Sequence, residues 1–301
     1  MSAELRPAPA RQGPGPMPTE LLDALDVELR RRAGGPLPGD QRAAGVGTGT
    51  ELAQLRPYEV GDDVRQLDAA ATARTGIPHV RLHVPERAVT TWLVLDVSPS
   101  MAFGTSRRLK SDVAEGVAMA FGRLALRRAG RLALVTFGAA RPIVLPPRGG
   151  RPALLGLRRA VEAGVAPDGP GDRSGLASAL HRLARMARLP GLVAVVSDFR
   201  DQDAWARALR LLGQRHDVIA VEIADRHEGE LPAAGHLTLV DPESGRHVAV
   251  DTSRSAVRRR YAAAERARRE GVARDLRAAR ARHVTLTTEG PWLRDLAGAL
   301  A

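Results

Sequence analysis

The chain has 301 residues, 44% of them hydrophobic, which is enough for a sizeable core, so we expect a globular protein. It contains no cysteine, which excludes disulfides, zinc-thiolate sites, iron-sulfur clusters and cysteine nucleophiles, and favours a cytoplasmic location. The net charge of +11 comes almost entirely from arginine, and because Ala, Gly and Pro are also abundant, we attribute it to a GC-rich genome and expect nucleic-acid binding to be unlikely.

The first 88 residues are predicted to stand apart from the rest of the chain. Residues 1–18 are rich in Pro, Ala and Gly without an apolar core, which indicates a flexible tail and not a signal peptide. Within the following unit, 19–88, the leucines of residues 20–29 fall on one face of a helix. Residues 34–51 contain alternating glycines, but no strand precedes them and no Lys-Ser/Thr pair follows, so we interpret them as a connector and not as a phosphate loop.

From about residue 91, short apolar runs alternate with helical stretches, which is typical of an α/β sheet covered by helices. Residues 138–141 are too few for a helical crossover, so the second and third strands should be antiparallel and the others parallel. The predicted fold class is α/β, with a doubly wound, mostly parallel six-stranded sheet in the order 3-2-1-4-5-6 and one antiparallel edge strand. The predicted strands are 91–95, 131–137, 142–145, 192–197, 217–223 and 283–287, and the predicted helices are 108–128, 151–163, 174–188, 201–214, 253–281 and 291–300.

Residues 89–301 thus form the predicted main domain, interrupted by polar turns and short alternating strands at about 226–251. The alternation predicts strands at 236–240 and 246–250, joined by the turn Asp241-Pro242-Glu243-Ser244-Gly245. We expect a β-hairpin insertion here. No segment of the chain approaches the roughly 20 apolar residues of a membrane span, so no span is predicted.

The strongest chemical signal follows the first strand of the predicted sheet. Asp96, Ser98 and Ser100 lie two residues apart on one tight loop and offer oxygen ligands that suit a hard cation. In the predicted strand order, the carboxyl ends of strands one and four flank the switch point where ligands bind. Asp198 follows strand four, and Ser174 supplies a hydroxyl before the third helix. We therefore predict that these residues hold Mg2+, or another divalent cation such as Mn2+ or Ca2+.

Each of these residues also has a purely structural interpretation. The serines could cap helices, and Asp198 could begin the helix predicted at residue 201. The pattern occurs a second time, as Asp251-Thr252-Ser253-Arg254-Ser255. We interpret that copy as a helix cap, because its strand is short and alternating, Arg254 would place a positive charge beside a cation, and it lies outside the switch point. The context favours the set that begins at Asp96.

The motifs resemble those of a known family. Asp96-x-Ser98-x-Ser100-Met101 with the later Val-Val-Ser-Asp-Phe of residues 195–199 resembles the von Willebrand factor A (VWA) domain. The upstream residues 56–68 resemble the signature of the DUF58 proteins, which carry such a domain. Further matching segments are Thr72-Ala73-Arg74, Arg81, Glu86-Arg87, 250–253 and 291–293.

The resemblance implies a bacterial, non-enzymatic protein that acts with a MoxR-type AAA+ ATPase in chaperone-like maturation or regulation of other complexes. It also implies that Asp96, Ser98 and Ser100 are metal ligands and that Asp198 is the distal carboxylate. Two positions depart from the family pattern. Ser174 stands where threonine is usual, which keeps the hydroxyl, and Ala69 stands where tryptophan is usual, which changes the packing of the upstream segment.

Closely spaced opposite charges mark that upstream segment. They can form a salt-bridged loop that fixes a small module, so we predict a structural or docking role, the alternative being an ordinary solvated turn. The residues are Asp62, Asp63, Arg65, Asp68 and Arg74.

Three functions remain open from the sequence. The first is a binding module in which a loop-bound Mg2+ accepts an acidic side chain of a partner protein. The second is an enzyme, either a metal-assisted hydrolase or a serine hydrolase using Ser98 or Ser197, although no nucleophile elbow or zinc motif occurs. The third is nucleic-acid binding through the arginine-rich residues 254–282, where acidic residues interrupt the charge and aromatic residues are scarce.

Overall fold

The structure is a computed structural model that describes residues 51–84, 89–105, 108–126, 130–169, 174–201 and 204–300. The predicted tail, the predicted helix at 20–29 and residues 34–50 of the predicted connector lie outside these residues. None of the described helices combines the length and the apolar character that crossing a bilayer requires.

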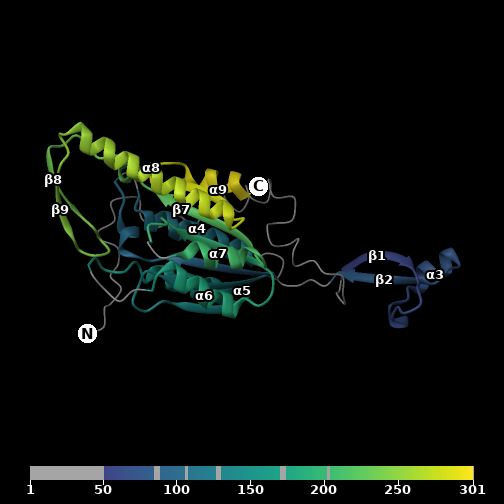
Figure 1. Cartoon of the computed structure of the whole chain (residues 1–301). Coiled ribbons are helices and arrows are strands. Elements are labelled where there is room, and N and C mark those ends of the chain that lie inside the picture. Colours follow the sequence, from purple (N-terminus) through teal and green to yellow (C-terminus); the bar gives the residue numbers. More distant parts are fainter. Residues whose placement is uncertain are drawn as a thin grey trace.

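The described chain begins with a small module for which the sequence analysis assigned no strands. Strand β1 (Glu51–Pro57) pairs antiparallel with β2 (His79–Val84). A 3-10 turn, η1 (Val64–Gln66), and a short helix, α3 (Ala69–Thr75), lie between them and are drawn in blue in Figure 1. A signal for β2 was present, because Val80 alternates with polar neighbours as in a half-buried strand.

The acidic residues of the predicted charged cluster hold the turns of this module. Asp62 accepts a hydrogen bond of 2.6 Å from the Nη2 of Arg56, an arginine outside the predicted cluster. Asp63 caps η1 and the buried Asp68 caps α3, each by accepting a backbone N–H of the first turn. The arginines of the predicted cluster, Arg65 and Arg74, are exposed. In these contacts the acidic residues cap two turns and form one ion pair, all within the module, and the structural or docking role of the cluster stays a prediction.

The main sheet has the predicted topology. Six strands lie in the order β10-β7-β6-β3-β4-β5, and only the β4–β5 pair is antiparallel. This is the 3-2-1-4-5-6 order expected from the sequence, with β3 as strand one and β6 as strand four. The strands are β3 (Thr90–Asp96), β4 (Arg131–Phe137), β5 (Val144–Arg148), β6 (Leu192–Ser197), β7 (Asp217–Ala224) and β10 (Arg282–Thr287).

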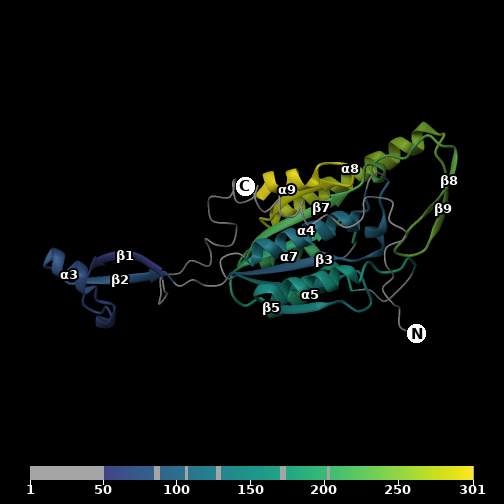
Figure 2. The same cartoon turned by 180° about the vertical axis from the view of Figure 1, so that it is seen from behind.

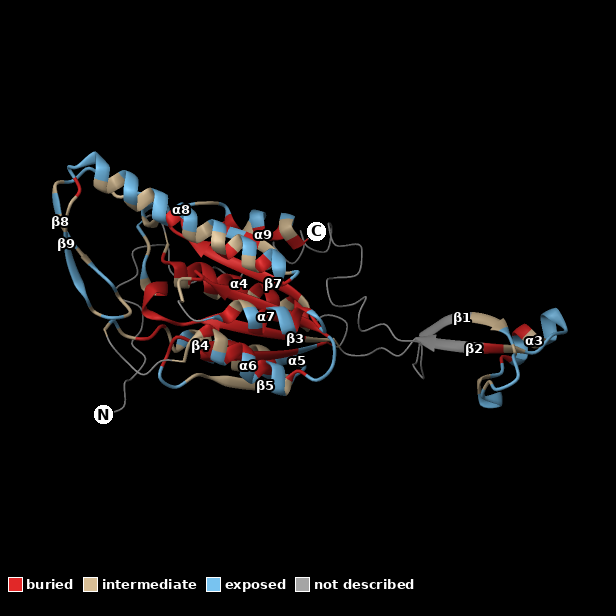
Figure 3. Ribbon diagram, in the orientation of Figure 1, coloured by how far each residue is buried: buried red, intermediate tan, exposed pale blue. Residues whose placement is uncertain are grey.

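Helices cover both faces of the sheet. Figure 3 shows the buried strands lying between helices whose outer surfaces are exposed. Leu93 and Leu95 of β3 pack in one core with α4, α5 and α9, whereas Trp92 and Val94 pack in the other with α6, α7 and α8. Because both faces are buried, β3, β4 and β6 appear in the sequence as continuous apolar runs. The helices are α4 (Lys110–Ala125), α5 (Gly150–Glu162), α6 (Leu176–Met186), α7 (Trp205–Gly213), α8 (Ser255–Ala278) and α9 (Trp292–Leu300).

The edge strand β5 begins two residues later than predicted and continues through Pro146 and Pro147. Proline cannot donate to a sheet ladder and is tolerated at an edge, so these prolines ended the sequence-based strand but not the real one. Helix α7 also differs, because it begins at Trp205 and not at residue 201.

The predicted hairpin insertion is present as β8 (His236–Val240) and β9 (His247–Asp251), which pair antiparallel. Figures 1 and 2 show the hairpin running from the N-terminal end of α8 back towards the main sheet. Its connecting turn contacts loops at the carboxyl ends of the sheet strands, through Pro242 and Glu243.

Candidate metal centre

Strand β3 delivers Asp96 to the carboxyl end of the sheet, where the side chain is only 4% exposed. Its Oδ1 accepts a hydrogen bond from the backbone N–H of Ser98 at 2.9 Å, which closes the loop after the strand. Its Oδ2 accepts from the hydroxyl of Ser197 at 2.6 Å, and Ser197 ends the neighbouring strand β6. Asp96 is therefore fixed at the switch point between β3 and β6.

The hydroxyls of the same loop connect Asp96 to the second carboxylate. Ser98 Oγ lies 3.1 Å from Ser100 Oγ, and Ser100 Oγ donates to Asp198 Oδ2 at 2.9 Å. All four residues are buried, and they come from segments about 100 positions apart. The structure thus brings together the two carboxylates and two of the hydroxyls that the sequence singled out.

Ser174 lines the same cavity from a third segment. Its backbone carbonyl accepts from Gly138 N at 2.8 Å, which joins its loop to the end of β4. Gly138 has a φ of +86°, and a Cβ there would lie 2.5 Å from Ser98 N, so the loops approach as closely as only glycine permits.

The helix-cap alternatives do not describe these residues well. Helix α6 begins at Leu176 after Gly175, and Asp201 Oδ2 accepts the N–H of Leu176 at 2.6 Å, so Asp201 and not Ser174 satisfies that helix end. Ser98 precedes the 3-10 turn η2 (Pro99–Ala102) without a side-chain cap. Asp198 does not start α7, because that helix begins at Trp205.

A buried lysine beside Asp198 was missed by the sequence analysis. Lys110, at the start of α4, is 0% exposed, and its Nζ lies 2.6 Å from both Asp198 Oδ2 and Glu228 Oε1. Burial opposes the charge of Lys110, but the two carboxylates outweigh it and hold its pKa above the ordinary value. A signal was available, because Lys110 is the only lysine in an arginine-rich chain.

The two aspartates differ sharply in their electrostatics. Burial and the nearby Asp198 carboxylate raise the pKa of Asp96 to about 7, although hydrogen bonds from Ser197 and Ser98 oppose the rise. Burial also opposes the charge of Asp198, but Lys110 holds the pKa of Asp198 below its usual value. Among the described residues, no cationic side chain contacts Asp96.

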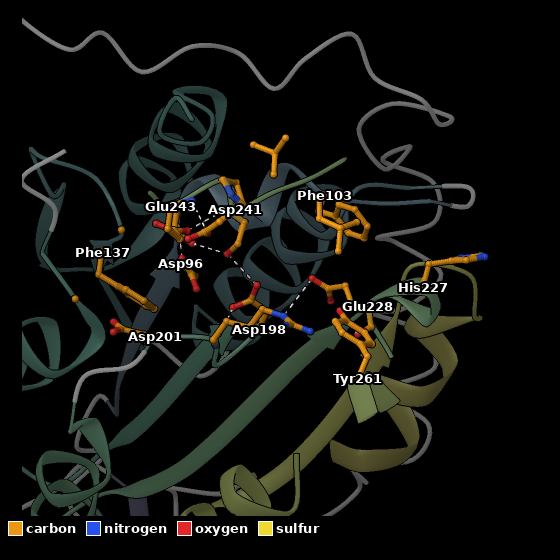
Figure 4. Close-up of a pocket in the computed structure, with 18 of the residues that line it drawn as sticks. Asp96, Phe103, Phe137, Asp198, Asp201, His227, Glu228, Asp241, Glu243 and Tyr261 are labelled. Atoms are coloured by element: carbon orange, nitrogen blue, oxygen red, sulfur yellow. Dashed lines mark hydrogen bonds and ion pairs between the residues drawn. The ribbon is translucent and has the colours of Figure 1, made fainter. Parts of the chain in front are cut away.

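These groups open into a cavity of about 750 Å3. Figure 4 shows Asp96 and Asp198 among the lining residues, with Phe103, Glu228 and Tyr261 to their right. Within the described part of the chain, no group of three or more His, Cys, Asp or Glu residues is placed to hold a metal. A cation here would depend on two carboxylates, serine hydroxyls and water, a donor set that suits Mg2+.

Comparison with known sequences decides the family. The sequence profile described as "Protein of unknown function DUF58" matches residues 54–271. The chain belongs to the DUF58 family. Relatives of this DUF58 chain include "Uncharacterized protein Rv1480" of Mycobacterium tuberculosis (strain ATCC 25618 / H37Rv) and "Uncharacterized protein Mb1516" of Mycobacterium bovis. Each is 38% identical over 279 residues, which cover 91% of this chain and 86% of the relative.

The VWA-like fold expected of a DUF58 protein is confirmed by the topology of its sheet, with the Asp-x-Ser-x-Ser loop at the switch point. Solved structures that resemble it include the conserved hypothetical protein BatB from Bacteroides thetaiotaomicron, with a TM-score of 0.45 and 13% identity over 70% of this chain and 96% of that one. The VWA domain of SpRpn10 gives a TM-score of 0.38 and 12% identity, covering 69% of this chain and 93% of that one. At these identities the likeness concerns the fold alone.

The second copy of the motif in this DUF58 chain is a local turn. Asp251 Oδ1 accepts from both the backbone N–H and the hydroxyl of Ser253, at 3.0 and 2.6 Å. Helix α8 begins at Ser255 after Arg254, which makes no side-chain cap. The predicted helix cap is therefore wrong in detail, because the carboxylate closes a turn just before the helix and does not bond the helix end.

Some charged side chains of the arginine-rich helix α8 contact the loop after β6, which carries Asp198. Glu265, 7% exposed, accepts hydrogen bonds from Arg200, Arg268 and Arg269 at 2.9 to 3.1 Å. Arg268 also donates to the backbone carbonyl of Phe199, next to Asp198. These arginines therefore support the loop after β6, a role that their spacing in the sequence did not reveal.

Proposed function

We propose that this DUF58 protein is a metal-dependent protein-interaction module that captures an acidic side chain of a partner. In this proposal the partner is a MoxR-type AAA+ ATPase, and the pair acts in chaperone-like maturation or regulation of protein complexes. The observation that carries the proposal is the buried Asp96 carboxylate, which lies beside Asp198 and has no cationic partner among the described residues.

The donor set supports a hard divalent ion. Asp96, Ser98 and Ser100 would hold it directly, and Asp198 and Ser174 line the same cavity. A bound ion would supply an open coordination position for a partner carboxylate. The chain's own residues orient the site, because Ser197 fixes Asp96 and Lys110 fixes Asp198.

The test is capture of a purified MoxR-type ATPase on immobilised protein, in Mg2+ and in excess EDTA. We expect capture in Mg2+ only, and its loss in Asp96→Ala. The matched control is Asp251→Ala, which removes the aspartate from the second copy of the motif and should leave capture intact. Equal capture by Asp96→Ala and wild type, or capture that persists in EDTA, would count against the proposal.

The competing hypothesis, a metal-assisted hydrolase, is tested with the same proteins. Turnover of ester, phosphate or nucleotide substrates that disappears in Asp96→Ala would favour catalysis over binding. The hydroxyl of Ser197 donates to Asp96 and accepts the N–H of Phe199 at 2.9 Å, and these bonds support an orienting role of Ser197 for Asp96.

A further inference from the structure

The hairpin strand β8 borders the cavity of the candidate metal centre. Its residues Thr238, Leu239 and Val240 all line that cavity, whereas none of the described residues of β9 does. Successive side chains of a strand point to opposite faces of its sheet, so a cavity that meets three consecutive residues lies along an edge of the strand and not over one face. Because β9 pairs with one edge of β8, the cavity lies along the other, which we call the outer edge.

Hydrogen bonds at both ends of the hairpin show which backbone groups face the outer edge. The N–H of Asp241 donates to the carbonyl of Arg246 at 2.9 Å. At the other end, the N–H of Thr252 donates to the carbonyl of Gly235 at 2.7 Å. The register between these two pairs is regular, and alternate residues of an antiparallel strand direct their N–H and C=O groups to opposite edges. The odd-numbered residues of β8 therefore bond β9, and the even-numbered ones direct their backbone groups to the outer edge.

The outer edge of β8 is available to another strand. Among the described strands, only β9 pairs with β8, so this small sheet has two strands. Thr238 is exposed and Val240 is 50% exposed, and both are even-numbered. An edge strand whose N–H and C=O groups are unpaired is a template for strand addition, and a third strand stabilises a sheet of two.

The hairpin is attached to the loops of the candidate metal centre, so its outer edge is held in place. Glu243 Oε1 accepts the backbone N–H of Ser100 at 3.1 Å. The carbonyl of Pro242 accepts the N–H of Gly169 at 2.9 Å. A partner that binds a preorganised edge does not have to order it, which favours binding.

The cavity also has an apolar lining near its carboxylates. Phe103 is 39% exposed, and Leu231, Leu239 and Tyr261 are half-buried along the cavity; Figure 4 shows Phe103 and Tyr261 on the same side of Asp198. Covering such surface favours binding through the hydrophobic effect. The volume of about 750 Å3 is in the range of sites that enclose a whole ligand, so there is room for more than one carboxylate side chain. The lining fits an acidic residue with apolar neighbours.

We propose that the partner docks as an extended segment that adds a third strand along the outer edge of β8. Its backbone bonds Thr238 and Val240, one acidic side chain reaches the ion at the candidate metal centre, and apolar side chains cover Phe103 and Tyr261. This inference rests on the proposed function and states the form in which the partner's carboxylate arrives.

Proline substitution tests one edge of the hairpin against the other. Thr238→Pro removes an N–H on the outer edge of β8, and the matched control Ala249→Pro removes one on the far edge of β9, directly opposite Thr238. Neither N–H bonds across the hairpin, and proline is tolerated at such edge positions. Thr238→Pro should weaken capture of the purified MoxR-type ATPase in Mg2+ by about tenfold, the loss of one backbone hydrogen bond, and Ala249→Pro should match the wild type. Both variants should bind Mn2+ as the wild type does, measured by the electron paramagnetic resonance signal of free Mn2+.

Amide hydrogen exchange tests the outer edge without a substitution. Saturating ATPase should slow exchange at the N–H groups of Thr238 and Val240 and leave that of Ala249 unchanged. Unchanged exchange at Thr238 and Val240, or capture by Thr238→Pro equal to the wild type, refutes the added strand; the proposed function stands if capture still depends on Asp96. If the wild type captures nothing, or Asp96→Ala captures equally well, the proposed function fails and the inference fails with it.

A second copy of the chain is the other occupant that the experiment can reveal. Sedimentation of the wild type alone should show no association through the outer edge. A wild-type dimer that Thr238→Pro converts to a monomer would identify a second copy as the added strand and overturn the proposal.

Discussion

Neutralising Asp96 should stabilise the metal-free protein, although it removes a residue of the site. The pKa of Asp96 is raised to about 7 from an ordinary 3.8 by burial and by the Asp198 carboxylate. Each pKa unit corresponds to about 1.4 kcal/mol, so the ionised side chain destabilises the folded state by roughly 4 kcal/mol above pH 7. Asp96→Asn removes this term but weakens the hydroxyl bond from Ser197, so we expect a net gain of about 2 kcal/mol at pH 8.

The sign of the pH dependence follows from proton linkage. The folded chain keeps the proton of Asp96 up to a higher pH than the unfolded chain, so the destabilising term is fully developed above pH 7 and is relieved as the pH falls from about 7 towards 4. The advantage of Asp96→Asn should therefore disappear near pH 5.

Asp198→Asn should have the opposite effect, which makes it the matched control. Lys110 holds the pKa of Asp198 below its ordinary value, so the charge of Asp198 stabilises the fold. Its removal leaves Lys110 buried with one carboxylate fewer, and we expect a loss of about 3 kcal/mol. Urea unfolding of the three proteins in EDTA, at pH 8 and pH 5, measures both effects. A variant Asp96→Asn that is less stable than the wild type at pH 8 would refute the reasoning.

Three further outcomes are expected. The affinity for Mn2+ should fall about tenfold per pH unit below pH 7, because a proton and the ion compete for Asp96; calorimetric titration that gives a constant affinity from pH 8 to 6 would contradict this. Lys110→Met should lower the free energy of unfolding by about 3 to 5 kcal/mol by breaking buried ion pairs, whereas Arg158→Met, at an exposed pair, should change it by less than about 1 kcal/mol. Gly138→Ala should impair Mn2+ binding, because the new Cβ would lie 2.5 Å from the backbone nitrogen of Ser98. The control Gly298→Ala should leave binding unchanged, because its Cβ would meet no described atom within 4 Å.

Much of the sheet could be predicted because a buried strand is marked by the apolar residues of its own short segment of sequence. Strands β4 and β6 have the predicted bounds, since a parallel strand buried on both faces must be a continuous apolar run. The proximity of Asp96 to Asp198 could also be predicted from the sequence. The predicted strand order puts the carboxyl ends of β3 and β6, where these residues lie, at one switch point.

The remainder of the site depends on tertiary packing that no periodicity encodes. Lys110 begins a helix and Glu243 lies in a hairpin turn, and in both cases the direction of the side chain is set by elements far away in the sequence. Glu265 looked like a solvated residue on a charged helix face, but the loop after β6 buries it among arginines. The uniqueness of Lys110 was the one sequence feature that marked it.

The most direct test of the central claim is a crystal soaked in millimolar Mn2+ and measured at the manganese absorption edge. The account predicts an anomalous peak bounded by Asp96, Ser98 and Ser100, with Asp198 on its far side, and predicts that the peak is absent from Asp96→Ala crystals. An ordered but empty site in the wild type, or a peak that Asp96→Ala leaves in place, would contradict it.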